Sequence, residues 1–203
     1  MNNYVFNLQF IKCEVDHGLK RFLSHSIMKD VRSFNIPVLP SQIRIPLQIL
    51  NARDFRNELR TASRNGFGIR NCFAYTDSHV HALSYQHLKG KVDRTDYLKM
   101  IRHECIHVLQ HLSSRIAPRG LTWLYESVAC VIAKQYRNTP LNPPTWFNFT
   151  RHFYAVPECY AVAYHFGKAM LKAYSLKDLI DLSKRKKECL QLSRKIYKST
   201  FHK

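Results

Sequence analysis

The sequence lacks a long apolar segment, a closely spaced cysteine pair and an excess of acidic residues. No apolar run approaches the roughly 18 residues that span a bilayer, so we expect no transmembrane helix. The six cysteines include no C-x-x-C pair, which is typical of free thiols in a reducing compartment rather than of a disulfide scaffold. The N-terminal stretch has neither a basic start nor a small-residue cleavage site. These absences predict a cytoplasmic protein without a secretory signal.

Basic side chains dominate the charge. The chain carries 32 Lys and Arg residues against 14 acidic residues, for a formal net charge of +18. Such a field favours polyanions, which include nucleic acid, anionic membrane surfaces and acidic proteins, although the same charge is compatible with side chains that are merely solvated. The densest basic stretch is KRKKECLQLSRKIYK, so we expect a basic C-terminal helix or tail over residues 184–203. An apolar fraction of 45% is ample for a packed core and excludes global disorder.

Hydrophobic periodicity predicts strands early in the chain and helices later. We expect strands at 4–10, 43–50, 69–76 and 79–85, and helices at 19–34, 52–63, 95–114, 121–136 and 158–174. Pro46 suggests that the second strand lies at a sheet edge, Asn51 can cap the helix after it, and Ser175 with Asp178 resembles a capping box. Turn signals occur at 65–68 and 117–120, and residues 138–157 read as a Pro-rich aromatic loop. The pattern predicts an α+β fold, with residues 1–183 as one domain.

The helix predicted at 95–114 contains the sequence His103-Glu104-Cys105-Ile106-His107, an HExxH motif. Histidines four residues apart on a helix lie one above the other, so both imidazoles can reach one metal ion. At about 100° per residue they fall opposite an apolar stripe that includes Cys105. Cys105 is therefore expected in the core. His111 is one turn too far along the axis to share the ion, which leaves a surface role or indirect support.

A third candidate ligand lies downstream, in the stretch Trp123-Leu124-Tyr125-Glu126-Ser127-Val128-Ala129. Glu126 is the one acid within a helix predicted to be apolar nearly all round. A buried carboxylate without a partner costs several kcal/mol, so such a residue needs a cation or a hydrogen-bond donor. The partner is either a metal ion or one of the many arginines. The short break before residue 121 predicts that the two helices pack as an antiparallel hairpin.

Together the two helices resemble the HExxH-x18-E signature of the gluzincin zinc metallopeptidases, in the small peptidase-MA-like group. Ser127 occupies a position where the family usually has glycine. The resemblance implies a small zincin-like α+β domain with a short N-terminal mixed sheet, a two-helix zinc site and a helical C-terminal part. It also implies Zn²⁺ bound by His103, His107 and Glu126, with Glu104 as the general base for a metal-activated water that hydrolyses a peptide bond.

The resemblance also implies a tyrosine that supports the oxyanion, for which Tyr160 is the better match and Tyr164 the reserve. Extended peptide or protein substrates in such folds add to an edge strand, and the stretch HVHALSY (79–85) is the candidate strand. Its His79 and His81 are expected to be ordinary polar strand residues. The GxMEN sequence of aminopeptidases is absent, which favours an endopeptidase or a narrow-specificity processing enzyme.

A different function class remains open. The chain could be a basic protein that binds nucleic acid or an anionic surface through residues 184–203, with a non-catalytic zinc site. The C-terminal run has few interleaved aromatic residues, so a base-stacking groove is not indicated. The two hypotheses are compatible with each other.

Overall fold

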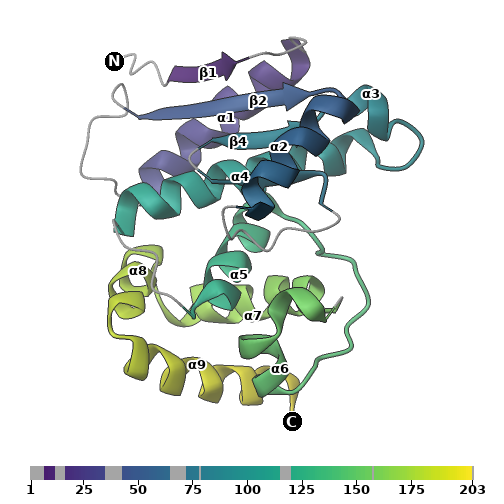
Figure 1. The fold of residues 1–203 in the computed structure, drawn as a ribbon. Helices are drawn as coiled ribbons and strands as arrows, with labels where there is room; N and C mark the ends of the chain where they lie inside the picture. The colour runs from purple at the N-terminus through teal and green to yellow at the C-terminus, as the bar shows by residue number, and fades with distance from the viewer. Residues whose placement is uncertain are drawn as a thin grey trace. The chain divides into compact units, whose positions relative to one another are not determined.

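The computed structural model describes residues 7–11, 17–34, 43–64, 72–77, 79–114, 120–156 and 158–202 (Figure 1). The chain forms two compact units. The first consists of residues 1–32 and 36–109, and the second of residues 33–35 and 110–203. Helix α4 (Arg94–Ser114) begins in the first unit, and its last residues, from Gln110, belong to the second. Each unit is described by itself below.

A mixed four-stranded sheet is the centre of the first unit. Its strand order is β1 (Asn7–Ile11), β2 (Arg44–Leu50), β4 (Val80–Leu83), β3 (Ala74–Thr76). Strands β1, β2 and β4 are parallel, whereas β3 is antiparallel to β4. The α+β class and the short N-terminal mixed sheet are therefore confirmed. The turn predicted at 65–68 and the start of the first predicted strand, residues 4–6, lie outside the described residues.

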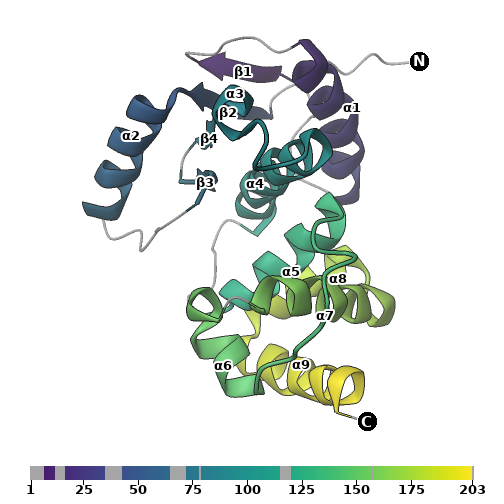
Figure 2. The same ribbon diagram turned by 90° about the vertical axis from the view of Figure 1, so that its right-hand side faces the viewer.

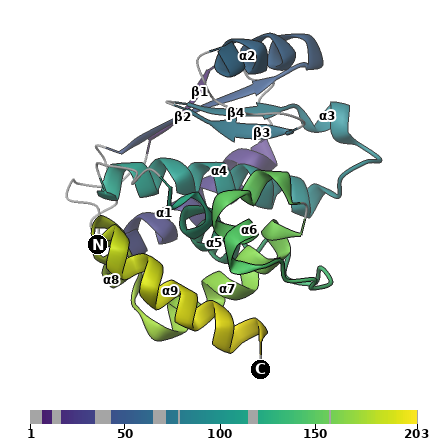
Figure 3. The ribbon, with the colours of Figure 1, turned by 60° about the horizontal axis from the view of Figure 1, so that its bottom comes forward.

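Helices cover both faces of this sheet. Figures 2 and 3 show α2 (Ala52–Arg64) on one face, with α1 (His17–Phe34) and α4 on the other. The predicted cap of α2 is confirmed, because Asn51 Oδ1 accepts hydrogen bonds from the backbone N–H groups of Arg53 and Asp54, both at 3.0 Å. Phe55 is buried in a cluster under α2, and Leu59 packs against it, as the helical spacing predicts. A one-turn helix, α3 (Tyr85–Leu88), follows β4.

The predicted edge position of Pro46 is wrong, because β2 pairs with β1 on one side and β4 on the other. The register explains how the proline is accommodated. Strand β1 pairs with β2 from Arg44 to Gln48, but pairing with β4 begins only at Leu47. Proline has no N–H to donate, and here it lies before the β4 ladder starts. Strand β2 is therefore central in the sheet, but at Pro46 it is paired only with β1.

The second unit is helical. It contains α5 (Thr122–Ala133), α6 (Trp146–Arg151), a 3₁₀ helix (Phe153–Ala155), α7 (Cys159–Ala173), α8 (Leu176–Lys184) and α9 (Lys186–Phe201). Its core is rich in aromatic rings, with centroids 5.1 to 6.2 Å apart among Trp123, Trp146, Phe149, Phe166 and Tyr197. Helix α5 packs chiefly against α7, which also contacts α8 and α9. The predicted capping box of α8, formed by Ser175 and Asp178, is confirmed.

Two predictions for this unit need correction. The helix predicted at 121–136 ends at Ala133, because Lys134 adopts a left-handed conformation (φ +59°) that terminates it. The stretch 138–157, predicted to be a loop, contains α6 and the 3₁₀ helix. Thr145 caps α6 by accepting a hydrogen bond from the N–H of Asn148 at 3.2 Å, and Phe149 is fully buried. Burial of aromatic side chains stabilises this short helix despite the nearby prolines.

The basic C-terminal segment is a packed helix over most of its length. One side of α9 is buried in the second unit through Cys189, Ser193 and Tyr197. The hydroxyl of Tyr197 donates to the carbonyl oxygen of Pro144 at 2.6 Å. Among the described residues, no helix is both long enough and apolar enough to cross a membrane.

Candidate metal centre

Helix α4 holds the two histidines of the HExxH motif against each other. The Nε2 atoms of His103 and His107 are 3.0 Å apart, and their rings meet edge to face with centroids 4.7 Å apart. His103 is only 4% exposed and His107 is half-buried. Two imidazole nitrogens therefore converge on one point beside the helix.

This separation suits two ligands of one zinc ion. Nitrogen ligands lie about 2.0–2.1 Å from Zn²⁺, so a tetrahedral angle places them about 3.3 Å apart. The observed 3.0 Å requires only a few tenths of an ångström of opening. Helical spacing alone produces this convergence, because residues four apart are stacked on one face. The histidine pair thus fits a zinc ion.

The opposite side of α4 is the core side. Tyr97, Ile101, Cys105 and Leu109 are all buried there. The predicted core position of Cys105 is confirmed, and burial raises the pKa of its thiol well above the ordinary range. The thiol is therefore inert despite its place inside the motif. His111, one turn beyond the pair, is exposed.

The carboxylate of Glu104 is oriented by a residue that the sequence did not point to. The hydroxyl Oγ1 of Thr76 lies 2.7 Å from Glu104 Oε2 and 3.0 Å from the Glu104 backbone carbonyl oxygen. Thr76 ends strand β3, 28 residues before Glu104. A threonine at a strand end has no distinctive sequence signal, so only the fold reveals this contact. It holds one carboxylate oxygen and leaves the other for chemistry.

An ion pair next to the motif ties α4 to α1. Arg102 donates to both carboxylate oxygens of Asp30, from Nε at 2.9 Å and from Nη2 at 2.7 Å. Asp30 is buried, and the Arg102 side chain is nearly so. A bidentate pair fixes direction as well as distance. The pair therefore restrains the rotation of α4 about its axis. Such a rotation would change the direction in which the His103 side chain points.

Glu126 lies in the second unit, on α5, and is 6% exposed. Its Oε1 accepts a hydrogen bond from the hydroxyl of Tyr154 at 2.8 Å. The expectation that this buried acid has a partner is confirmed by the tyrosine. Tyr154 was not predicted, because it lies within the aromatic stretch 138–157 that reads as a loop. Carboxylate oxygens are common zinc ligands, and the hydrogen bond from Tyr154 restricts how this carboxylate can turn.

Helix α5 is fitted closely to α7 at the residue after Glu126. Ser127 is fully buried, and its hydroxyl donates to the carbonyl oxygen of Trp123. A side chain at Gly167 of α7 would overlap the Ser127 carbonyl oxygen. The close approach of Gly167 therefore fixes the backbone of α5 at Ser127, next to Glu126. Within the same unit, Gln110 Nε2 donates to the Tyr125 carbonyl oxygen at 2.9 Å.

The two tyrosines proposed for the oxyanion lie on α7. Tyr160 is half-buried, with its ring 5.4 Å from Tyr136 and 5.1 Å from Phe153, centroid to centroid. Tyr164, one turn on, is buried. The tyrosine that the structure places on a candidate ligand is instead Tyr154. A role for Tyr160 in the reaction stays a prediction.

The prediction that strand 79–85 receives an added substrate strand is wrong. Strand β4 lies inside the sheet, between β2 and β3, so both of its sides are already paired. Among the described strands, β3 is the outer one on this side. His81 is not an ordinary polar strand residue either, because it is buried and stacks on Tyr75.

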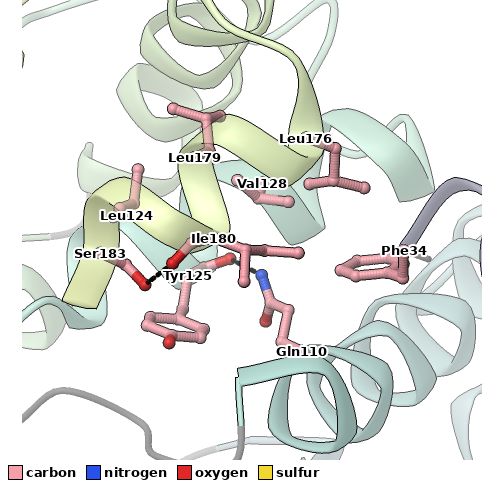
Figure 4. Close-up of a pocket in the computed structure, with 9 residues that line it drawn as sticks. All are labelled: Phe34, Gln110, Leu124, Tyr125, Val128, Leu176, Leu179, Ile180 and Ser183. Atoms are coloured by element: carbon pink, nitrogen blue, oxygen red, sulfur yellow. Dashed lines mark hydrogen bonds between the residues drawn. The ribbon is translucent and has the colours of Figure 1, made fainter. Parts of the chain in front are cut away.

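A small apolar cavity in the second unit does not suit a substrate. It lies between α5 and α8, and Figure 4 shows the Gln110 amide beside it, directed at the Tyr125 carbonyl. The cavity has a volume of about 20 Å³, which is room for about one water molecule. It is lined by Phe34, Gln110, Leu124, Tyr125, Val128, Leu176, Leu179, Ile180 and Ser183. We interpret it as a packing gap.

The candidate site residues belong to both units. Glu104 and the two histidines lie in the first, whereas Glu126, Tyr154 and Tyr160 lie in the second. The chain matches no family model, no curated protein and no solved structure. The likeness to gluzincins therefore depends on the motif residues and on the local geometry of each unit.

Proposed function

We propose that this protein is a zinc-dependent peptidase of the gluzincin type. His103, His107 and Glu126 would bind Zn²⁺, and Glu104 would act as the general base. The observation that carries the proposal is the pair of Nε2 atoms 3.0 Å apart on the helix that also carries a Glu104 carboxylate held by Thr76. Two convergent imidazoles beside an oriented carboxylate are the working parts of metal-assisted peptide hydrolysis.

The residues divide the work between binding and proton transfer. A bound Zn²⁺ supplies the Lewis acidity that lowers the pKa of water and polarises the peptide carbonyl. Glu104 accepts the proton of the attacking water and later passes it to the leaving amine nitrogen. Thr76 keeps the carboxylate in the orientation that proton transfer needs. Tyr154 does the corresponding work for Glu126, since it occupies one oxygen and restricts the rotation of the carboxylate.

An extended peptide is the substrate class that suits the first unit. Thr76 is both the last residue of the outer strand β3 and the hydrogen-bond partner of Glu104. A peptide that pairs with β3 by β-augmentation would therefore pass near the Glu104 carboxylate. This arrangement suits cleavage within a chain, as expected for an endopeptidase or a narrow-specificity processing enzyme. The hydroxyl of Tyr160 is proposed to support the oxyanion.

Metal analysis tests the site before any substrate is known. The purified chain should contain Zn²⁺ at the histidine pair, and His103→Ala should lose it. His111→Ala is the matched control, because His111 lies on the same helix but is exposed. Glu104→Gln should retain zinc and abolish cleavage in a peptide-library assay. A wild-type chain that binds no zinc at His103 and His107 would rule out the peptidase.

A second candidate function is binding of nucleic acid by α9, which one observation favours. Lys187, Arg194, Lys195 and Lys198 are exposed along this helix, and none of them forms an ion pair with a described residue. Unpaired cations spaced along one helix attract phosphates. This function is compatible with peptidase activity on proteins bound to nucleic acid.

A salt titration tests this second candidate. In the double variant Lys195→Glu/Lys198→Glu, the slope of log K against log salt for DNA or RNA should fall by about 2, because two phosphate contacts are lost. The control is Lys89→Glu/Lys91→Glu, which reverses two exposed charges in the turn after α3. An equal decrease of the slope in both variants would show that the effect depends only on net charge and not on α9.

A further inference from the structure

A second group of metal-binding side chains lies in the turn between β3 and β4. Asp77, His79 and His81 each offer a ligand atom, and these atoms lie within 4.8 Å of one another. All three residues belong to the first unit. They are separate from the histidine pair on α4, and the proposed peptidase function makes no use of them.

Two of the three ligand atoms are already held close together. His81 Nε2 is 3.1 Å from Asp77 Oδ1, and the same oxygen accepts the backbone N–H of His79 at 2.8 Å. The hydrogen bond from the backbone fixes the Asp77 carboxylate at the start of the turn. His79 directly precedes β4, two residues before His81, and its ring lies near the ring of His81. Their ring centroids are 6.0 Å apart.

His81 is a rigid anchor for this group. It is 4% exposed, and its ring stacks on Tyr75 with centroids 4.6 Å apart and planes 9° apart. Its Nδ1 is buried and has no hydrogen-bond partner among the described residues. Burial of an imidazole with one unsatisfied nitrogen is destabilising, because that nitrogen loses its hydrogen bonds to water. A structural turn alone could use an apolar residue here, so the conspicuous property of His81 is the nitrogen that it presents to Asp77.

We propose that Asp77, His79 and His81 form a second divalent-metal site, which takes Zn²⁺. Two imidazole nitrogens and one carboxylate oxygen are the donor set that zinc and its neighbours in the first transition row prefer. Two imidazoles on one tetrahedral ion place their ring centroids about 5 Å apart, so the observed 6.0 Å must close by about 1 Å. Asp77 is exposed and His79 is half-buried, so both can make that adjustment while His81 stays in place.

The position of the site links it to the Glu104 carboxylate. Thr76, whose hydroxyl binds Glu104, immediately precedes Asp77. An ion at the turn would restrain the backbone that carries Thr76. We expect the site to bind metal more weakly than the histidine pair on α4, because two of its three ligands are accessible to water and must move to bind. The proposal stands without the peptidase function.

Zinc titration of a chain without its first histidine pair tests the inference. In the double variant His103→Ala/His107→Ala, calorimetric titration with ZnCl₂ under reducing conditions should still detect one Zn²⁺ per chain. Adding His79→Gln should weaken this binding by at least about tenfold, since one of three ligands is lost. His25→Gln is the matched control, because His25 is an exposed histidine of the same unit. Circular dichroism checks that every variant is folded.

The outcomes separate this site from the first one. Two zinc ions in the wild type and one in the double variant support both sites. One zinc ion in the wild type and one in the double variant support only the site formed by Asp77, His79 and His81. A double variant that binds no zinc overturns the inference and leaves the α4 site untouched, as does His79→Gln binding as tightly as its parent. Asp77→Asn, which changes an exposed residue, repeats the test if His79→Gln fails to fold.

Discussion

Replacement of Gly167 by alanine should destabilise the second unit, although alanine is the better helix former. Gly167 lies on α7 and packs closely against the backbone of α5. An added methyl group would overlap the carbonyl oxygen of Ser127 and lie 2.9 Å from Val131 Cγ2. Ser127 directly follows Glu126, so the same contact fixes the position of a proposed zinc ligand.

Two effects of opposite sign determine the result. Alanine in a helix interior is worth about 1 kcal/mol relative to glycine. Overpacking costs about 1–3 kcal/mol, and the cost here falls towards the upper end because the obstructing atoms are backbone atoms of α5, which cannot rotate away. The expected net loss is about 1–2 kcal/mol in the free energy of unfolding. The two helices must separate to admit the methyl group.

Urea unfolding followed by tryptophan fluorescence measures this loss directly. Both tryptophans of the chain, Trp123 and Trp146, lie in the second unit, so the signal reports on the part that the substitution changes. Lys172→Ala, at an exposed position of the same helix, should stay within about 0.5 kcal/mol of the wild type. A Gly167→Ala variant that is about 1 kcal/mol more stable than the wild type would refute the argument, since it would show only the helix-propensity gain.

Three further predictions concern the first unit. Thr76→Val should lower kcat about ten- to a hundredfold at unchanged zinc content, because Glu104 loses the hydroxyl that orients it; an equal loss in the exposed Thr61→Val would contradict this. Arg102→Met should lower the free energy of unfolding by about 3–5 kcal/mol in chemical denaturation, because Asp30 stays buried without its partner, and adding Asp30→Leu should recover much of it. Burial raises the pKa of Cys72 to about 12, so its alkylation at pH 8, followed by peptide mass spectrometry, should be about a thousandfold slower than in the urea-unfolded chain, and equal rates would disprove it.

Most helices were predictable because their signals are local. The spacing of apolar residues located α1, α4 and α7, and Asn51 and Ser175 marked the starts of α2 and α8 through bonds to residues no more than three positions away. Helix α6 was missed for a related reason. Prolines before it suggest a loop, whereas its stability comes from burying Phe149 among rings that are far away in the sequence.

The arrangement of strands was not predictable from the same signals. A proline in β2 indicated an edge strand, but whether a strand is at the edge depends on how far its neighbours extend. The pairing of β2 with β4 begins at Leu47, one residue after Pro46, so the proline does not interrupt it. Strand β4 was expected at the edge and lies inside the sheet. Pairing between strands depends on contacts across long loops, which no short window of sequence contains.

The candidate metal centre likewise has features that the local sequence predicts and features that only the tertiary structure reveals. The histidine pair and Glu104 follow from the HExxH spacing, because the geometry of an α-helix stacks residues four apart whatever surrounds them. The partners of the carboxylates do not follow from it. Thr76 on Glu104 and Tyr154 on Glu126 each join residues 28 positions apart, and His81 becomes a buried anchor only because β4 is an inner strand. Helix geometry is a property of the local chain, whereas these contacts exist only after distant segments have packed together.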